Sequence, residues 1–350
     1  MPDLVVAGAG MAGLAAAVRG RELGAEVVVH EKGDRPGGSM LLSTGFLWRY
    51  REWERFRAEC PGGDPDLQRL VWERLDDDLA WLESLGALAV VRETGNELTS
   101  GARFDTKQLT ETLCRRAGDV RLAEPLTELP HEVPVILATG GFQAGVDLVE
   151  SYITPEARSL VLRSNPWSTG DALRLAVDRG AELSVGMDEF YGRNLAAAPH
   201  IAEADFVPLA QVYARHARVE NLAGETYEPR TWSDIDVVQW TARQPGARAR
   251  YVVPDDALGE SVRERTVGGL IEAARRAGAP VERRKGSTVV EVVAGITTTL
   301  GGLRIDAQAR AAEGIYAAGA DAGGISTGGW ASALASALVL GKVAAESALS

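Results

Sequence analysis

Short apolar runs alternate with glycines at the start of the chain. The first run, Leu4 to Ala7, is followed by a glycine-rich turn and by a helical stretch that ends near Leu23. A second strand-like run, Glu26 to His30, comes next. Short uninterrupted apolar runs are typical of parallel strands that are buried on both faces. The pattern therefore predicts a strand–helix–strand unit at the start of the chain.

The same reasoning predicts elements further along the chain. Charged and apolar residues that alternate at helical spacing indicate two amphipathic helices. Apolar runs that end in glycine indicate further buried strands, and the last segment begins with glycines before it becomes helical. The helices are expected at 66–85 and 104–116, the strands at 134–138, 289–293 and 314–321 with its turn, and the last helix within 328–348.

The turn after the first strand has the G-x-G-x-x-G spacing of a dinucleotide-binding fold. The first glycine permits the tight turn, the second lets the backbone approach a pyrophosphate, and the third lets the helix pack on the strand. Glu31 follows the second strand, 23 positions after Gly8 (31 − 8), where a carboxylate accepts hydrogen bonds from a ribose. The motif predicts a bound dinucleotide without deciding between FAD and NAD. Its residues are Gly8, Ala9, Gly10, Met11, Ala12 and Gly13.

The segment that begins at Glu31 carries a family resemblance. Glu31 and Lys32 are followed by Gly37-Gly38-Ser39 and by a stretch of mostly small residues from Leu42 to Trp48. Here the sequence resembles the FAD-dependent fumarate reductase/succinate dehydrogenase flavoprotein superfamily, particularly its ketosteroid dehydrogenase and tricarballylate dehydrogenase-like branches. The resemblance implies FAD as the cofactor. It also implies that FAD is bound non-covalently, because no histidine lies near Ser39, where some relatives attach FAD through one.

The resemblance further implies which residues contact FAD. They lie in the first glycine turn, after the second strand, at the end of the strand at 134–138, in a T-G-D segment, in the terminal glycine turn and at the start of the last helix. Beside the six motif residues they are Glu31, Lys32, Gly37, Gly38, Ser39, Ser43, Thr44, Gly45, Ala138, Thr139, Gly140, Asp171, Gly319, Ala320, Asp321, Ser332, Ala333 and Leu334.

The flavin-binding segments lie on both sides of an insertion. We expect an α/β fold in which a Rossmann-like FAD-binding domain, with a parallel sheet similar to that of glutathione reductase, is interrupted by an α+β cap domain. The expected segments are 1–186 and 287–350 for the FAD-binding domain and 187–286 for the cap. The stretch Val120 to Val133 is shorter than the β-meander that relatives carry there. Families of this kind place substrate between cap and flavin.

The candidate proton-transfer residues fall in the expected cap. The resemblance to fumarate reductases implies an arginine proton donor and a histidine–arginine clamp for the dicarboxylate. However, the donor position falls at Asp234, and no histidine or arginine follows Arg310, which disfavours fumarate or succinate as substrate. The tyrosine of ketosteroid dehydrogenases falls near Thr327. Eight cap residues remain as candidates, and four of them are chosen as catalytic groups. The four are Tyr191, Tyr213, His216 and Arg230, and the others are Arg193, His200, Arg215 and Asp234.

These features favour an enzyme that dehydrogenates or reduces a carbon–carbon bond α,β to a carbonyl or carboxylate, with hydride exchanged at flavin N5. An amine or hydroxy-acid oxidase on the same scaffold is an alternative, and it would release hydrogen peroxide. A non-catalytic flavin-binding subunit is a third possibility, and no small molecule would reduce its flavin. The substrate, the direction of the reaction, the electron acceptor and the oligomeric state are left open by the sequence.

Composition narrows the expected partners. The formal net charge of −12 disfavours nucleic acid and anionic membrane surfaces, so we expect a small-molecule substrate. Cys60 and Cys114 form no metal, haem or iron–sulfur motif, so we expect no metal site and an external electron donor or acceptor. No apolar stretch is long enough for membrane insertion, and the low cysteine content fits a cytoplasmic location.

Overall fold

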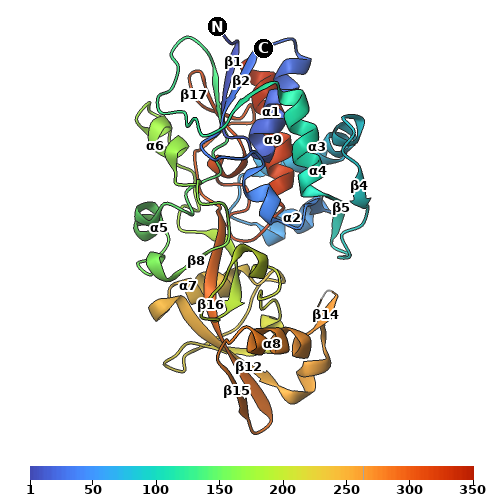
Figure 1. The fold of residues 1–350 in the computed structure, drawn as a ribbon, viewed down its shortest axis with the longest axis vertical. Helices are drawn as coiled ribbons and strands as arrows, with labels where there is room; N and C mark the ends of the chain where they lie inside the picture. The colour runs from blue at the N-terminus through green and yellow to red at the C-terminus, as the bar shows by residue number, and fades with distance from the viewer. Residues whose placement is uncertain (263) are drawn as a thin grey trace. The chain divides into compact units, whose positions relative to one another are not determined.

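The chain forms two compact units (Figure 1). The computed structural model describes residues 1–262 and 264–350. The first unit comprises residues 1–145, 165–189 and 298–350, and the second comprises residues 146–164 and 190–297.

The units divide the chain at positions that differ in part from those expected. Residues 146–164 and 287–297 belong to the second unit, whereas the sequence placed both stretches in the FAD-binding segments. The physical reason is the long strand β16 (Ser287–Thr299), which pairs with β8 (Val161–Leu162) and so holds both stretches in one sheet. Near residue 187 the expected and observed boundaries lie close together, since the first unit ends at Glu189 there.

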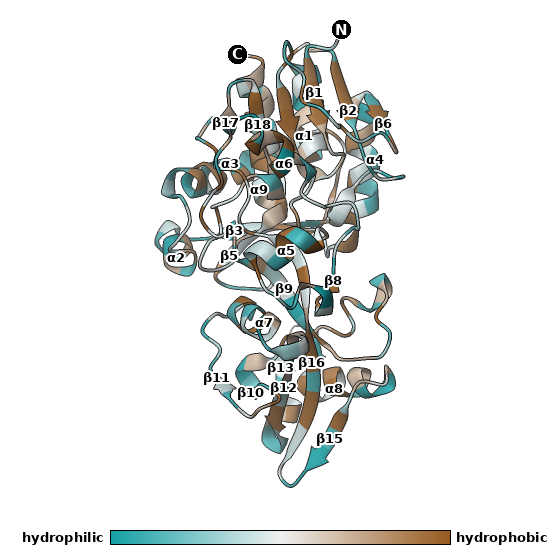
Figure 2. Cartoon of the chain, turned by 90° about the vertical axis from the view of Figure 1, so that its left-hand side faces the viewer, coloured by the Kyte–Doolittle hydropathy of each residue, from teal (hydrophilic) through white to brown (hydrophobic). Residues whose placement is uncertain are grey.

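A six-stranded sheet forms the centre of the first unit. Its order is β17-β18-β7-β1-β2-β6, and only the pair of β17 with β18 is antiparallel. Strands β1, β7 and β18 are buried along their whole length, and Figure 2 shows β1 and β2 in the brown of hydrophobic residues. The predicted strands at 4–7, 26–30, 134–138 and 314–321 are confirmed in this sheet, whereas the strand predicted at 289–293 is part of β16 in the second unit and pairs antiparallel there. The strands are β1 (Leu4–Ala7), β2 (Val27–His30), β6 (Asp119–Arg121), β7 (Val135–Leu137), β17 (Arg310–Ala312) and β18 (Ile315–Ala317).

Two helices of the first unit are the amphipathic helices that the sequence predicts. Helix α3 (Pro65–Ser84) begins after Asp64, whose side chain accepts hydrogen bonds from the first-turn amides. Helix α4 (Thr106–Ala117) begins after Asp105, which caps it in the same way. Capping carboxylates satisfy amides that have no partner within the helix, which explains where both helices start.

Small residues bring two other helices of this unit into close contact. Helices α1 (Met11–Glu22) and α9 (Ala333–Ala348) pack so closely that a Cβ at Gly341 would lie 2.3 Å from the Ala12 oxygen.

None of the helices in the described part of the chain has the length and apolar composition of a membrane span. The unit also contains α2 (Trp53–Glu59), α6 (Asp171–Val177), the 3-10 turns η1 (Gly38–Leu42) and η7 (Gly319–Asp321), and a small antiparallel sheet of β3 (Phe46–Tyr50), β5 (Thr99–Phe104) and β4 (Ala89–Val91).

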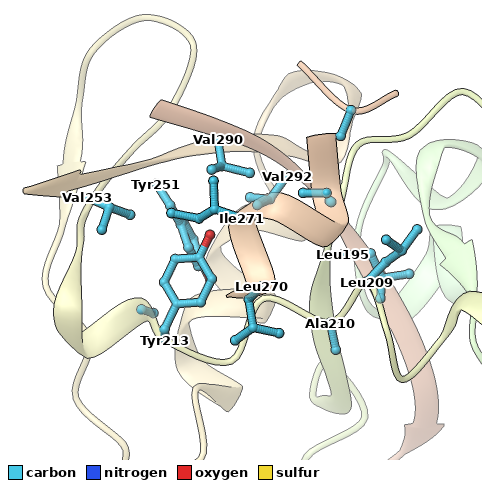
Figure 3. Packing of buried hydrophobic residues seen from close by; sticks show 14 of the residues in the cluster. Leu195, Leu209, Ala210, Tyr213, Tyr251, Val253, Leu270, Ile271, Val290 and Val292 are labelled. Carbon is cyan, nitrogen blue, oxygen red and sulfur yellow. The ribbon is translucent and has the colours of Figure 1, made fainter. Parts of the chain in front are cut away.

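A seven-stranded sheet forms the centre of the second unit. Its long strand β16 pairs with β12, β15, β8 and β9 along different parts of its length. Helix α8 (Val267–Arg276) buries an apolar face on it at helical spacing. Figure 3 shows Ile271 of this face beside Val290 of β16, and Leu270 and Val292 belong to the same buried cluster. The other elements are β9 (Phe190–Ala196), β10 (Arg218–Glu220), β11 (Thr226–Tyr227), β12 (Arg248–Pro254), β15 (Val281–Arg284), the hairpin of β13 (Ser261–Val262) and β14 (Arg265–Thr266), α5 (Val146–Tyr152), α7 (Ile235–Ala242), and the 3-10 turns η2 (Ala157–Ser159), η3 (Glu203–Asp205), η4 (Ala214–His216), η5 (Pro245–Ala247) and η6 (Asp255–Gly259).

A buried ion pair joins α3 to α9 in the first unit. The Lys342 ammonium contacts the Asp78 carboxylate, and the two side chains are only 8% and 2% exposed. The same ammonium lies 4.4 Å from the centroid of the Trp81 ring. Burial raises the pKa of the Asp78 carboxyl, and the nearby ammonium opposes that rise. Each charge therefore depends on the other for a partner in a place with little exposure to water.

Asp78→Ala is expected to lower the free energy of unfolding by about 3–5 kcal/mol, because it leaves the Lys342 ammonium buried without its carboxylate. Urea and thermal denaturation measure this loss. The control is Asp255→Ala, which breaks a pair with Arg283 whose side chains are 41% and 56% exposed. The control should cost about 1 kcal/mol or less. Equal losses for the two variants would contradict the importance of burial.

Candidate functional site

The glycine turn after β1 combines two packed glycines with one that faces open space. A Cβ at Gly8 would lie 2.2 Å from the Ala138 oxygen, and a Cβ at Gly13 would lie 1.8 Å from the Gly8 oxygen. Gly8 also has φ +102°, which side-chain-bearing residues rarely adopt. By contrast, a Cβ at Gly10 would meet nothing within 4 Å. Gly8 and Gly13 therefore serve backbone packing, while Gly10 leaves room for a ligand.

The start of α1 faces this open space. Gly10 is the N-cap residue and provides no side chain to satisfy the first amides. The side chains of Met11 and Ala12 are buried, so these residues can contribute to a ligand through their backbone. The Gly37 amide donates a hydrogen bond to the Ala9 oxygen at 2.7 Å, which holds a second glycine segment against the turn. Unsatisfied amides and the helix dipole attract anions, so the site fits a pyrophosphate.

Glu31 closes the end of β2 next to the glycine turn. One carboxylate oxygen accepts a hydrogen bond from the Ala9 amide at 2.7 Å and the other from the Gly33 amide at 2.6 Å. The residue is buried, with 7% of its surface exposed. A carboxylate oxygen can accept more than one hydrogen bond. Glu31 is therefore held in place by backbone groups and can still accept ribose hydroxyls.

Lys32 and Asp171, which the sequence placed separately in the cofactor site, form an ion pair. The Lys32 ammonium lies 2.7 Å from the Asp171 carboxylate and donates to the Thr169 hydroxyl at 2.7 Å. Both charged side chains are about one-third exposed, at 36% and 35%. The pair joins the loop after β2 to the start of α6. Two predicted cofactor residues are thus brought to the same edge of the site.

Asn165 is a site residue that the sequence did not predict. Its side-chain amide donates to the Ser39 hydroxyl at 2.7 Å and to the Ser168 hydroxyl at 3.1 Å. Asn165 and Ser168 are buried, and a Cβ at Gly38 would lie 3.8 Å from the Asn165 amide nitrogen. The available signal was its place in the sequence shortly before the T-G-D segment that carries Asp171. No local pattern pairs Asn165 with a residue 126 positions away.

Asp321 holds the loop that follows β7. Its carboxylate accepts hydrogen bonds from the Gly141 amide at 2.9 Å and from the Thr139 hydroxyl at 2.9 Å, and also from the Thr139 amide. Burial raises the pKa of the Asp321 carboxyl, and these hydrogen bonds oppose the rise. The predicted residues Thr139, Gly140 and Asp321 therefore form one connected cluster. In this structure the carboxylate positions the loop backbone.

The remaining predicted cofactor residues lie at the same unit's strand ends and helix starts. Ser43 donates to the Met40 oxygen at 2.7 Å and accepts from the Gly45 amide at 3.1 Å. Ser332 caps α9 through the Ala335 amide at 3.3 Å. Thr44 is exposed, Gly140, Gly319, Ala320, Ala333 and Leu334 are half-buried, and Ala138 and Gly45 are buried.

Tyr213 lies in the core of the second unit, which differs from its expected catalytic role. The residue is 0% exposed, and its hydroxyl donates to the Gln211 side chain at 2.7 Å. Its ring meets the Tyr251 ring edge-on at 5.5 Å between centroids (Figure 3). Burial raises the pKa of the Tyr213 hydroxyl well above its ordinary value. A phenol without exposed surface cannot touch a substrate in this conformation. Closeness to His216 in the sequence therefore did not indicate a shared site.

The other candidate catalytic residues have different settings within the second unit. Tyr191 is half-buried on β9, with the Arg193 guanidinium 5.0 Å from its ring centroid. His216 is half-buried in η4 and lines an open cavity of about 460 Å³. Arg230 is exposed and donates to the Tyr227 hydroxyl at 2.9 Å. Burial raises the pKa of that hydroxyl.

The described residues offer no cluster of three or more histidine, cysteine, aspartate or glutamate side chains that could hold a metal ion. The groups gathered in the first unit are instead helix-start amides, a buried carboxylate and close backbone turns. This set suits the phosphates and ribose of a dinucleotide.

Comparison with known proteins identifies the family of the chain. The FAD binding domain family model matches residues 3–133 and 131–334. The chain belongs to this family, and its cofactor is FAD. This membership agrees with the FAD cofactor that the sequence resemblance implies.

Two curated relatives match about half of the chain. A vinyl phenol reductase of Lactiplantibacillus plantarum is 27% identical over 237 residues, which cover 54% of this chain and 48% of the relative. A fumarate reductase (cytochrome) of Shewanella frigidimarina is 25% identical over 230 residues, which cover 52% of this chain and 40% of the relative. These matches span less than half of each relative's length.

Solved structures share the fold over nearly the whole chain. An open conformation of a flavocytochrome c3 fumarate reductase has a TM-score of 0.74 at 21% identity, covering 99% of this chain and 78% of the other. The 3-ketosteroid-Δ4-(5α)-dehydrogenase of Rhodococcus jostii RHA1 has a TM-score of 0.71 at 20% identity, covering 100% and 97%. These similarities establish the α/β flavoprotein fold.

Gly10→Ala is expected to weaken FAD binding at least about tenfold while leaving the apoprotein stable, because the added methyl enters open space at the start of α1. Flavin fluorescence titration of the apoprotein and its thermal unfolding measure the two effects. The matched variant Gly8→Ala places the same methyl against the Ala138 oxygen and should lower the unfolding temperature itself. Unchanged FAD affinity in a folded Gly10→Ala protein would contradict the assignment of the open space to the pyrophosphate.

Proposed function

We propose that this protein reduces or dehydrogenates a carbon–carbon bond α,β to a carbonyl or carboxylate group. The observation that supports the proposal is the reaction type in the names of its relatives, which are reductases and dehydrogenases. Fumarate and vinyl phenol both contain a carbon–carbon double bond conjugated with a π-system. The bound FAD would supply a hydride donor or acceptor at N5.

The residues of the first unit would hold the dinucleotide. The α1 amides would bind the pyrophosphate, Glu31 would accept the ribose hydroxyls, and the cluster around Asp321 would fix the loop after β7. Binding would be non-covalent. Ser39 stands where some relatives carry the histidine that attaches FAD, and its hydroxyl accepts a hydrogen bond from Asn165. The start of α9, capped by Ser332, would favour negative charge nearby.

The second unit would supply the proton-transfer group. Among the four residues that the sequence singled out, we favour Tyr191 because its hydroxyl belongs to a half-buried side chain beside the Arg193 guanidinium. His216 and Arg230 stay as candidates, and Tyr213 is set aside because it is fully buried. The missing histidine and arginine after Arg310 favour a substrate other than a dicarboxylate. An external small molecule or protein would exchange electrons with the flavin.

The flavin of the purified protein is expected to react with compounds that carry an activated carbon–carbon bond. Mixed anaerobically, saturated ketones or carboxylic acids should bleach the oxidised flavin, or enones and unsaturated acids should restore the colour of the reduced flavin. Visible absorption follows both reactions across a panel that includes amines and hydroxy acids as controls. Bleaching by amines or hydroxy acids alone, with hydrogen peroxide formed in air, would show an oxidase instead. A flavin that no compound changes would indicate a non-catalytic protein.

Tyr191→Phe is expected to slow flavin turnover with an active compound by about a hundredfold or more, because it removes the proposed proton-transfer hydroxyl. Tyr213→Phe removes the same atom from the core and serves as the matched control. This control should keep the rate and lose about 1 kcal/mol of stability with the hydrogen bond to Gln211. A Tyr191→Phe rate within twofold of the wild type would exclude Tyr191 as the acid or base.

A further inference from the structure

The indole ring of Trp167 lies flat against the backbone of the loop after β2. A Cβ at Gly33 would lie 2.7, 2.8 and 2.8 Å from three ring atoms, Cε3, Cδ2 and Cζ3 of Trp167. Nearly equal distances to three atoms mean that the face of the ring, not its edge, covers Gly33. The side chain is half-buried, so part of the ring stays open to a ligand.

Hydrogen bonds on both sides of Trp167 hold the ring in this position. The Trp167 amide donates to the Asn165 side chain at 2.9 Å, and Asn165 in turn donates to Ser39 at 2.7 Å. On the other side, Lys32 binds Thr169 and Asp171 at 2.7 Å each. The loop that carries Trp167 is thus fastened twice to the loop after β2. The ring is ordered before any ligand arrives, which lowers the entropy cost of stacking on it.

The ring also lies beside the group that fits a ribose. The Gly33 amide, which the indole covers, donates to Glu31 at 2.6 Å. Glu31 stands where dinucleotide-binding folds bind the adenosine ribose, and the base is attached to that ribose. Arg35 adds a second planar group, with its guanidinium carbon 5.6 Å from the Trp167 ring centroid. Indole and guanidinium planes both stack on nucleobases.

We propose that Trp167 is the aromatic wall against which the adenine of FAD stacks. The indole then contributes to the choice of FAD over FMN, because FMN has no adenine to place there. The proposal uses only the FAD-binding unit and is independent of the reaction that the protein catalyses.

The test measures the binding of FAD, FMN and ADP to the apoprotein, with ADP measured by its displacement of FAD. Trp167→Ala should weaken FAD and ADP binding about tenfold or more and leave FMN binding unchanged within about twofold. Trp167→Phe keeps a smaller aromatic face and should retain most of the affinity. Trp53→Ala is the control, because it removes another half-buried indole of the same unit, whose ring centroid lies 3.7 Å from the guanidinium carbon of Arg69. It should change none of the three affinities.

Two results would overturn the proposal. One is a folded Trp167→Ala protein that binds ADP as tightly as the wild type. The other is an equal loss of FMN and ADP affinity together with a lower unfolding temperature, which would show that the indole only packs the two loops together. The binding test needs no substrate. It therefore tests the role of Trp167 even if no compound in the absorption panel reacts with the flavin.

Discussion

The close backbone contact between the glycine turn and the end of β7 is the constraint on which the flavin site depends. No side chain fits between Gly8 and the Ala138 oxygen or between Gly13 and Gly8. Helix α1 can therefore start directly behind the strand ends, with its uncapped amides beside the open space at Gly10. Moving the helix outward by the width of a methyl group would move its dipole away from the open space in which we propose that the phosphates bind.

Around this turn, buried polar contacts fix loops that are distant in sequence. Asp321 holds the loop after β7, Glu31 holds the turn after β1, and Asn165 joins the loop before α6 to Ser39. In each of these hydrogen bonds the loop contributes a backbone amide or a hydroxyl. These polar groups of the loops therefore have hydrogen-bond partners. A site that is ordered in advance loses less conformational entropy when the cofactor binds.

The second unit shows how a polar residue can look catalytic in the sequence and be structural in the fold. Tyr213 and His216 are three positions apart, yet one is in the core and the other lines an open cavity. The 3-10 turn η4 turns the chain between them. Tyr191, on a strand and half-buried, has the accessibility that a proton-transfer group requires.

The sequence alone was sufficient for the strand–helix–strand unit, the glycine turn, the capped helices and the FAD family, because each depends on local spacing or on a contiguous motif. It also pointed to Glu31 at the end of the second strand, since that position follows from the length of the unit. Only the tertiary structure decided the ends of the second unit, the burial of Tyr213, the pairing of Ser39 with Asn165 and the contact of Trp167 with Gly33. These features arise where segments separated in the sequence meet: Tyr213 packs on Tyr251, 38 positions away (251 − 213), and Ser39 pairs with Asn165, 126 positions away. Hydrophobic periodicity carries no information about such contacts.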